Sequence, residues 1–258
     1  MNLNVSGFGH TGINILYASD VLVTGCYIST CGYSGVTGLS VDKMIVQVCT
    51  VDGLTGETSS GNAYGITFTS VTDADLVRYP VSEDCLASSN IVKNVPSWHG
   101  IDTHAGERIV FEGNTVSNCR RGIILTYHPS AGPTDCRVIN NVIQTDLTGT
   151  NAFGADAVGD GIWDIGATGA LATRNIISNN NVYQHGGKIT TGAGLYIDGA
   201  TGGTYSGNVF KECTGNGIYL GANVTNPLIS GNVFFDTKSA GTGAGAPTDQ
   251  CPGIRISA

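Results

Sequence analysis

The chain has 258 residues, of which only 12% are charged, whereas 41% are hydrophobic and 38 residues are glycine. So few charges beside so much glycine exclude a mainly helical protein, and the high apolar content excludes a disordered one. The formal net charge of −8 argues against nucleic acid as a partner, because binding a phosphate backbone needs clustered Lys and Arg.

Two short phrases recur along the chain and predict repeated strands. The first is a glycine followed by an aliphatic residue: Gly12-Ile13, Gly35-Val36, Gly65-Ile66, Gly100-Ile101, Gly122-Ile123, Gly161-Ile162, Gly194-Leu195, Gly217-Ile218 and Gly253-Ile254. The second centres on Asn: Ser89-Asn90-Ile91-Val92, Gly113-Asn114-Thr115-Val116, Asn140-Asn141-Val142-Ile143, Asn180-Asn181-Val182-Tyr183, Gly207-Asn208-Val209-Phe210 and Gly231-Asn232-Val233-Phe234. Asn side chains can bond to stacked copies of themselves, so the second phrase predicts an Asn ladder at a corner.

Two phrases per repeat at variable spacing are typical of a solenoid whose loops leave from fixed corners. The phrasing resembles the pectate-lyase-like superfamily. This resemblance implies an all-β fold, a single-stranded right-handed parallel β-helix of roughly eight to nine rungs, with residues 1–258 as one domain. A β-propeller is the structural alternative, although its blades would be longer and more regular. Both ends of the sequence read as strands in progress, so we expect a fragment that lacks one or both end caps.

The cysteines show neither the paired spacing of a zinc site nor that of a redox motif. We expect them to fill the inside of the coil as small apolar residues, with one or two disulfides as the alternative. They are Cys26, Cys31, Cys49, Cys85, Cys119, Cys136, Cys213 and Cys251. The sequence contains no apolar run long enough to cross a membrane as a helix.

The densest polar segment of the sequence, residues 98–108, predicts a functional cluster. Alternation along a strand places Asp102 and His104 on the same outward face, about 6 to 7 Å apart. Arg121 immediately precedes a repeat glycine, as His99 does one coil earlier, so these two residues are predicted to be stacked neighbours. With the following coils, the candidate catalytic residues are His99, Asp102, His104, Arg121, Tyr127, His128, Asp160 and Asp164.

Imidazoles beside carboxylates can carry out acid–base chemistry near neutral pH. One alternative is that these side chains are simply solvated. Another is that His99, Asp102 and His104 are metal ligands. We expect no metal and no cofactor, because no further ligand pattern accompanies them, and no acidic cluster indicates Ca²⁺.

One stretch of the cluster resembles the Tyr-Gly-Phe-Asp-Pro-His segment of the mannuronan C5-epimerase β-helix: His99-Gly100-Ile101-Asp102-Thr103-His104. The resemblance implies that Asp102 and His104 belong to a site that abstracts the C5 proton of a uronic acid. The family's Tyr and Pro are replaced here by His99 and Thr103, and no Lys stands at the expected place one rung upstream.

Two chemistries remain open at this cluster. A related uronate lyase needs a cation for the substrate carboxylate, a base at C5 and an acid for the leaving oxygen, which Arg121, His104 and Tyr127 could supply in that order. A glycoside hydrolase needs two carboxylates, about 5 Å apart if retaining and about 6.5–9.5 Å apart if inverting. The candidate pair is Asp102 with either Asp160 or Asp164.

Two positions after each repeat glycine, the residues should stack into an outward column. The column is Asn14, Thr37, Thr67, Asp102, Ile124, Trp163, Tyr196, Tyr219 and Arg255. Its three aromatic members predict an exposed aromatic strip along the helix axis. Because sugar rings stack on aromatic faces, we expect Trp163, Tyr196 and Tyr219, together with Trp98, to bind substrate. The alternative is that loops at 144–160 and 184–193 cover the strip.

These features together predict a protein that binds an extended polysaccharide along its side and cleaves or modifies it, as a lyase or a glycoside hydrolase. Phage tail-spike proteins use the same fold, usually as trimers. A non-catalytic receptor-binding or structural tail spike is therefore the alternative, and a surface adhesin a third hypothesis. A polysaccharide partner, a homotrimer and a location outside the cell or on the virion surface are further expectations.

Overall fold

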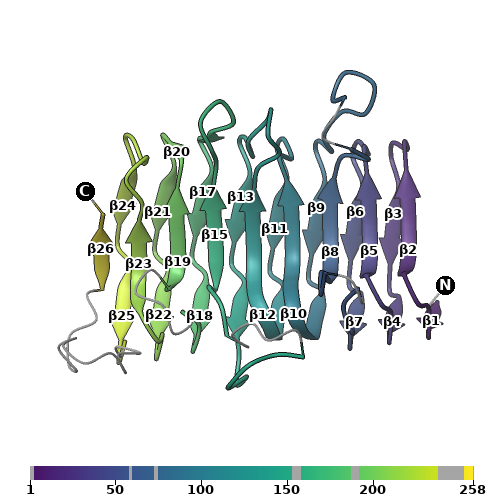
Figure 1. The fold of residues 1–258 in the computed structure, drawn as a ribbon, viewed down its shortest axis with the longest axis horizontal. Coiled ribbons are helices and arrows are strands. Elements are labelled where there is room, and N and C mark those ends of the chain that lie inside the picture. Colours follow the sequence, from purple (N-terminus) through teal and green to yellow (C-terminus); the bar gives the residue numbers. More distant parts are fainter. Residues whose placement is uncertain are drawn as a thin grey trace.

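The computed structural model describes residues 3–57, 60–72, 75–152, 158–186, 192–237 and 253–257. Every regular element in these residues is a β-strand. Each strand pairs in parallel with the strands one coil before and one coil after it. Figure 1 shows the strands side by side along the long axis, with the N-terminus at one end and β26 (Ile254–Ile256) at the other. The prediction of a parallel β-helix is confirmed. No helix in the described residues is long and apolar enough to cross a membrane.

Three ladders of strands run along this axis, and the first carries the apolar residues that follow the Asn phrase. It consists of β1 (Asn4–Ser6), β4 (Tyr27–Ser29), β7 (Thr50–Asp52), β10 (Ile91–His104), β12 (Thr115–Thr126), β14 (Val142–Gln144), β18 (Asn181–Tyr183), β22 (Val209–Lys211) and β25 (Val233–Phe235). Strands β10 and β12 are much longer than the others and continue into the second ladder.

The second ladder carries the glycine phrase and is called the site face below. It consists of the later parts of β10 and β12 with β2 (Thr11–Leu16), β5 (Ser34–Leu39), β8 (Tyr64–Thr69), β15 (Ile162–Ile165), β19 (Ala193–Asp198), β23 (Asn216–Leu220) and β26. All nine members of the column predicted two positions after each repeat glycine are in register on this face.

The third ladder forms a separate sheet. It consists of β3 (Leu22–Thr24), β6 (Ile45–Gln47), β9 (Leu86–Ser88), β11 (Val110–Glu112), β13 (Arg137–Ile139), β17 (Ile176–Ser178), β21 (Thr204–Ser206) and β24 (Leu228–Ser230). A small sheet of β16 (Ala172–Thr173) and β20 (Ala200–Thr201) completes the described strands.

The core lies inside the coil, because the middle residue of each three-residue strand points inward. In the first ladder Ile28, Val51 and Val92 stack directly on one another and are fully buried. Phe210 stacks on Phe234 at the far end, with ring centroids 5.5 Å apart. Such stacking of similar side chains buries each one against its copies in the neighbouring coils, which stabilises the fold through apolar burial.

The repeat glycines are required by close packing at the start of each site-face strand. A Cβ on Gly100 would lie 2.9 Å from the carbonyl oxygen of Gly122 in the next coil and would overlap the Val116 side chain. Gly65 meets the same obstacle from Gly100 and Val92. The glycine phrase therefore marks the point where the backbone passes directly over an inward side chain.

The predicted Asn ladder is confirmed at the corner before the first ladder, except that in the fourth copy Asn180 occupies the ladder position predicted for Asn181, which faces outward on β18 instead. Each Asn donates through Nδ2 to the Oδ1 of the next Asn along the axis at 2.9–3.0 Å, in the order Asn90, Asn114, Asn141, Asn180, Asn208 and Asn232. The left-handed backbone position is the residue before each ladder Asn, such as Asn140 or Gly113. This is why the phrase begins with a small residue or a second Asn.

The seven cysteines within the described residues are buried and free, so the expectation of apolar fillers is confirmed for them and no disulfide joins them. The eighth, Cys251, lies outside the described residues. Burial raises the pKa of Cys119 and of Cys136 to about 12, which keeps both thiols protonated and unreactive.

Candidate functional site

The predicted polar cluster is assembled by the stacking of β8, β10 and β12. His99 pairs with Tyr64 on one side and with Arg121 on the other, which confirms that His99 and Arg121 are stacked neighbours. Asp102 and His104 follow on the same strand, and their side chains meet on its outer face. The regular register of the site face therefore brings residues from three coils into one cluster.

Asp102 is the centre of this cluster and is fully buried. Its Oδ2 lies 2.9 Å from His99 Nδ1 and 3.1 Å from His104 Nε2, while its Oδ1 has no hydrogen-bond partner within the described structure. Burial alone raises the pKa of this carboxyl, but the two imidazoles, His104 first, bring it well below its ordinary value. Asp102 is therefore a carboxylate at neutral pH that accepts a hydrogen bond from each ring.

The proton on His99 can be assigned from its neighbours. Arg121 Nη1 lies 3.3 Å from His99 Nε2, and a guanidinium can only donate. His99 Nε2 must therefore accept, which leaves the proton on Nδ1, where it is donated to Asp102. The ring is 3% exposed, and burial lowers the pKa of His99 to about 4, so it is neutral at neutral pH.

Arg121 is half-buried and lies between two indole rings. Its guanidinium carbon is 4.8 Å from the centre of the Trp98 ring and 4.2 Å from that of Trp163. Trp98 also stacks on His99, with centroids 5.0 Å apart. Burial lowers the pKa of Arg121 to about 10, which still leaves it charged at neutral pH. These contacts hold the guanidinium beside His99, 3.3 Å from its Nε2.

A cavity of about 420 Å³ opens beside His104 on the site face. It is lined by His10, Thr11, Asn14, Tyr33, Thr37, Leu39, Tyr64, Thr67, Thr69, Ser70, Val71, Thr72, His104 and His128. His128 lies 3.0 Å from both Thr69 Oγ1 and Ser70 Oγ, and its ring centroid is 5.5 Å from that of His104. None of these lining residues is Asp, Glu, Lys or Arg, although the protein as a whole carries a net charge of −8.

Tyr64 is a member of this site that the sequence analysis missed. Its ring centroid is 5.6 Å from His99 and 5.9 Å from His104, both in edge-on contacts. Burial, followed by the charge of Asp102, raises the pKa of its phenol far above the ordinary range, so the group keeps its proton. Tyr64 directly precedes Gly65, just as His99 precedes Gly100. Examining the residue before every repeat glycine would have identified it.

The two other predicted carboxylates lie elsewhere. Asp160 is buried, accepts from Trp163 Nε1 at 2.7 Å and from the Ala193 amide at 2.6 Å, and burial raises its pKa. Asp164 lies inside the coil, where Tyr205 Oη donates to it at 2.6 Å. The prediction of Asp164 in the outward patch was wrong, because strand alternation one residue after outward Trp163 turns its side chain inward.

Tyr127 follows the last residue of β12 and is exposed, and no contact in the described structure joins it to Asp102 or His104. The predicted proton donor is therefore not part of the assembled cluster. Tyr64, on the opposite side of β10, contacts His104 instead.

The aromatic strip is formed as predicted but is less exposed. Trp163 and Tyr196 have ring centroids 6.1 Å apart, and Tyr196 stacks on Tyr219 at 5.2 Å with an interplanar angle of 3°. Trp163 and Tyr196 are half-buried, and Tyr219 is only 7% exposed. The loops predicted as a possible cover fall partly outside the described residues, at 153–157 and 187–191.

The ring contacts continue beyond the strip toward the N-terminus. His99 lies 6.1 Å from Trp163, Tyr64 lies 5.6 Å from His99, and Tyr33 lies 5.3 Å from Tyr64. His10 stacks on Tyr33 at 4.7 Å. We call the whole series from His10 to Tyr219 the aromatic file; it crosses the Asp102 cluster and joins the cavity to the strip.

His99, Asp102 and His104 also satisfy the spacing of a metal site, since their ligand atoms lie within 4.8 Å of one another. The neighbouring Arg121 opposes this assignment. A metal on His99 Nδ1 would move the ring proton to Nε2, where it would face the N–H groups of Arg121. The residues present therefore fit a hydrogen-bonded cluster better than a metal centre.

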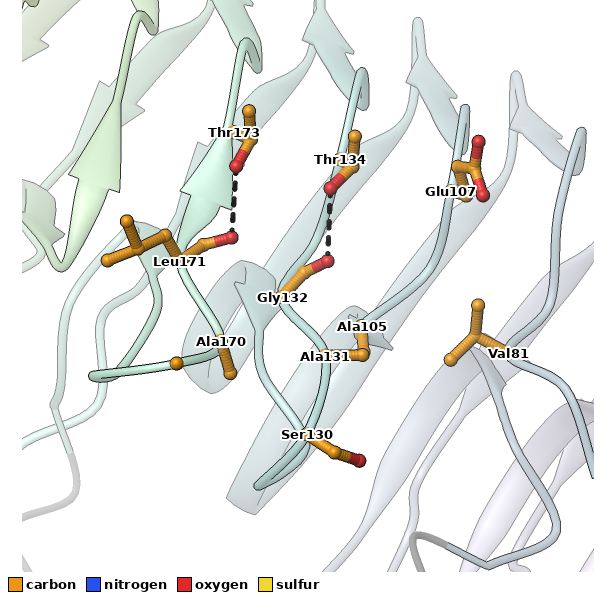
Figure 2. A pocket seen from close by; sticks show the side chains of 11 residues that line it. Val81, Ala105, Glu107, Ser130, Ala131, Gly132, Thr134, Ala170, Leu171 and Thr173 are labelled. Carbon is orange, nitrogen blue, oxygen red and sulfur yellow. Dashed lines mark hydrogen bonds between the residues drawn. The ribbon is translucent and has the colours of Figure 1, made fainter. Parts of the chain in front are cut away.

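A larger hollow of about 540 Å³ lies away from this cluster, between turns at the edge of the coil (Figure 2). Its walls are mostly small residues such as Ala131 and Ala170, and Thr134 and Thr173 bond to carbonyl oxygens of their own turns. Its one carboxylate, Glu107, is paired with Arg108. The hollow thus lacks the converging polar groups that mark the Asp102 cluster.

Fold and register define this protein as a right-handed parallel β-helix with a buried His–Asp–His cluster on one outer face. The family described as right handed beta helix region matches residues 2–143, more than half of the chain. The chain therefore belongs to this family. No curated protein matches the sequence.

Solved structures share the fold at low sequence identity. The alginate lyase from Paenibacillus sp. str. FPU-7 is 14% identical, with a TM-score of 0.65 over 99% of this chain and 80% of that one. The tailspike protein of E. coli bacteriophage HK620, in complex with pentasaccharide, is 16% identical, with a TM-score of 0.64 over 98% of this chain and 45% of that one. DFA-IIIase from Arthrobacter chlorophenolicus A6 is 12% identical, with a TM-score of 0.60 over 91% and 51%. The chain spans about half the length of the last two proteins.

Proposed function

We propose that this protein acts on an extended acidic polysaccharide by proton transfer, with His104 as the base. The observation that carries the proposal is the position of His104. Its Nε2 is held by the buried carboxylate of Asp102, while the side chain lines an open cavity that has no acidic residue among its described lining residues. The second ring nitrogen, Nδ1, is thereby left to accept a proton from a substrate.

Proton transfer is favoured over hydrolysis by the placement of the carboxylates. A glycoside hydrolase needs two carboxyl groups facing one bond. Asp102 is fully buried and already accepts two imidazole donors, Asp160 is bonded to Trp163 and Ala193, and Asp164 lies inside the coil. Around the described cavity no second carboxylate faces Asp102.

The substrate class follows from the cavity and the aromatic file. Three histidines and several hydroxyl groups, without a carboxylate, give a wall that can accept a uronate without repelling its charge. Trp163 and Tyr196, the two half-buried rings of the strip, lie on the same face, where sugars could contact them. The eight stacked strands from β2 to β23 extend roughly 34 Å at about 4.8 Å per strand, enough for several sugar units.

In a β-elimination, His104 would remove the C5 proton of a uronate. The electron pair of that C–H bond would form the C4–C5 double bond, and the bond from C4 to the glycosidic oxygen would break. Tyr64 would protonate the leaving oxygen, because its phenol keeps its proton and its ring lies 5.9 Å from that of His104. Exchange with water would then restore both residues. Return of a proton to C5 instead would give epimerisation.

The alternative is a receptor-binding spike without catalysis, which the aromatic file alone would support. Similarity to a phage tailspike and to a polysaccharide lyase fits both readings. A location outside the cell or on the virion surface belongs to either one, as does assembly into a homotrimer.

The test is a screen of wild type and His104→Ala against acidic and neutral polysaccharides, following reducing ends and the absorbance of unsaturated uronate together. The proposal predicts absorbance with an acidic polymer that the substitution abolishes. Reducing ends without absorbance would instead indicate hydrolysis, and binding without turnover would indicate a spike. Tyr64→Phe and Tyr127→Phe form a matched pair, of which only the first should slow the reaction.

A further inference from the structure

We propose that Arg121 is a positioning residue that fixes the tautomer of His99 and, through Asp102, holds His104 ready to act as a base. The proposal rests on the proposed function for its catalytic consequence. The hydrogen-bonded chain itself stands on geometry. It runs from Arg121 through His99 and Asp102 to His104, and only the last member reaches the cavity.

The direction of every hydrogen bond in this chain follows from the groups that can only donate or only accept. Arg121 has five N–H donors and no acceptor, so His99 Nε2 must carry the lone pair. His99 then donates from Nδ1 to Asp102 Oδ2, and Asp102 has only acceptors to offer His104. His104 is thereby held with its Nε2–H toward the carboxylate and its Nδ1 unprotonated.

Arg121 itself is held in place by packing rather than by a carboxylate. Its guanidinium lies between Trp98 and Trp163, and within the described structure its Nε has no hydrogen-bond partner. Gly159 closes the remaining side, because a Cβ there would lie 2.9 Å from Arg121 Cγ. A cation whose Nε is buried without a partner in the described structure is retained at a cost in stability, which indicates a role beyond folding.

The stacking of Arg121 between Trp98 and Trp163 also connects the hydrogen-bonded chain with the aromatic strip. Trp163 is the first ring of the aromatic strip and contacts both Tyr196 and the Arg121 guanidinium. Trp163 therefore lies between the rings of the strip and the guanidinium that faces His99.

Removal of the guanidinium takes away the donor that faces His99 Nε2, so that only Asp102 still favours the Nδ1–H form. In the Nε2–H form, the lone pair of Nδ1 would face the Asp102 carboxylate and repel it, so Asp102 would lose one of its two donors. His104 would no longer be held in one orientation. Binding through the aromatic strip would remain, while turnover would fall.

The experiment compares wild type, Arg121→Met and Arg121→Lys, with Arg137→Met as the control because Arg137 is exposed on the separate third-ladder sheet. Two-bond ¹H–¹⁵N correlation spectra report the tautomer of each histidine without substrate. We expect Nδ1–H at His99 and Nε2–H at His104 in wild type, in Arg121→Lys and in the control. Arg121→Met should show a population of the Nε2–H form of His99 beside the Nδ1–H form, because the donor that opposes a proton on Nε2 is gone.

Turnover provides the second readout. Arg121→Met should lower kcat about 10²-fold or more with little change in KM, as expected when a histidine base loses its correct tautomer. Arg121→Lys, which keeps a donor, should restore part of the activity. An Nε2–H tautomer at His99 in wild type, or an unchanged tautomer in Arg121→Met, would overturn the proposed role of Arg121 whether or not the protein is active. If the wild type shows the predicted tautomers but is inactive, the role of Arg121 as a positioning residue is supported and the proposed function is contradicted.

If Arg121→Met does not fold, the wild-type spectrum and Arg121→Lys still decide the question. A wild-type His99 that is protonated on Nε2 contradicts the assignment directly.

Discussion

The Asn ladder and the Asp102 cluster are both buried networks of polar side chains, yet they are built in opposite ways. The ladder repeats one residue in six coils, and each internal Asn both accepts from and donates to its neighbours. The cluster uses each residue once and leaves Asp102 Oδ1 and Arg121 Nε without partners in the described structure. A satisfied network stabilises a fold, whereas an unsatisfied buried charge costs stability. The difference teaches that the ladder serves folding and the cluster serves chemistry.

The largest expected effect lies in the cluster. Asp102→Asn replaces an acceptor by an amide that must direct N–H toward one histidine, so we expect turnover to fall about 10³-fold or more. The free energy of unfolding should fall by less than the barrier to turnover rises, because a folded-state pKa below the ordinary value means that the carboxylate contributes stability at neutral pH and the amide keeps only part of its hydrogen bonds. Kinetics and thermal unfolding measure both, with exposed Asp20→Asn as the control. A large loss of stability with proportionate loss of activity would assign Asp102 a structural role.

The ladder should show the reverse pattern. Asn141→Ala removes the acceptor of two Asn114 N–H groups and the donors to Phe111 O and Asn180 Oδ1. Several buried groups would lose their partners, so we expect destabilisation of about 3 to 5 kcal/mol. Denaturant unfolding checks this against Asn181→Ala, which changes an outward-facing Asn one coil on. Equal stability of the two variants would contradict the ladder's role.

A third effect concerns the buried carboxyl inside the coil. Burial raises the pKa of Asp164 from 3.8 to about 6, although Tyr205 and Asn175 donate to it. A folded-state pKa above the unfolded value means that stability is fully present below about pH 4 and is lost as pH rises through about 6. The loss amounts to about 3 kcal/mol. Asp164→Asn should remove this pH dependence, as unfolding measured from pH 4 to 8 will test. A persisting slope would place its origin in another group.

The smallest effect is expected at the aromatic strip. Trp163→Ala, made together with His104→Ala to prevent turnover, should weaken binding of an acidic oligosaccharide about 10-fold. Isothermal titration calorimetry measures the affinity, with Phe235→Ala as the control because that ring is exposed on the first ladder. Undiminished binding would remove Trp163 from the substrate face.

The regular part of the molecule could be predicted from the sequence because each phrase has one physical cause. The glycine marks a close backbone approach, and counting two residues onward gave a column that is in register from Asn14 to Arg255. The stacking of His99 on Arg121 followed from the same count. Neighbouring parallel strands lie a fixed distance apart, so the offset of a residue from its repeat glycine determines which residues of the adjacent coils lie beside it.

The site was predicted less completely, because the burial and the direction of a side chain depend on the packing of several coils. Arg121 was predicted as the cation for a substrate carboxylate, but its place between Trp98 and Trp163 was not predicted. Asp164 was expected outside, although alternation places it inside with Tyr205. Tyr64 was missed because only the positions after the glycines were counted along the whole chain.

The central claim, that His104 removes a proton from C5 of a uronate, is tested most directly by ¹H NMR of an acidic polysaccharide incubated in D₂O. Wild type should cause loss of the C5–H signal, through elimination or through exchange during epimerisation, and His104→Ala should leave the signal intact. New reducing ends with an undiminished C5–H signal would contradict the claim.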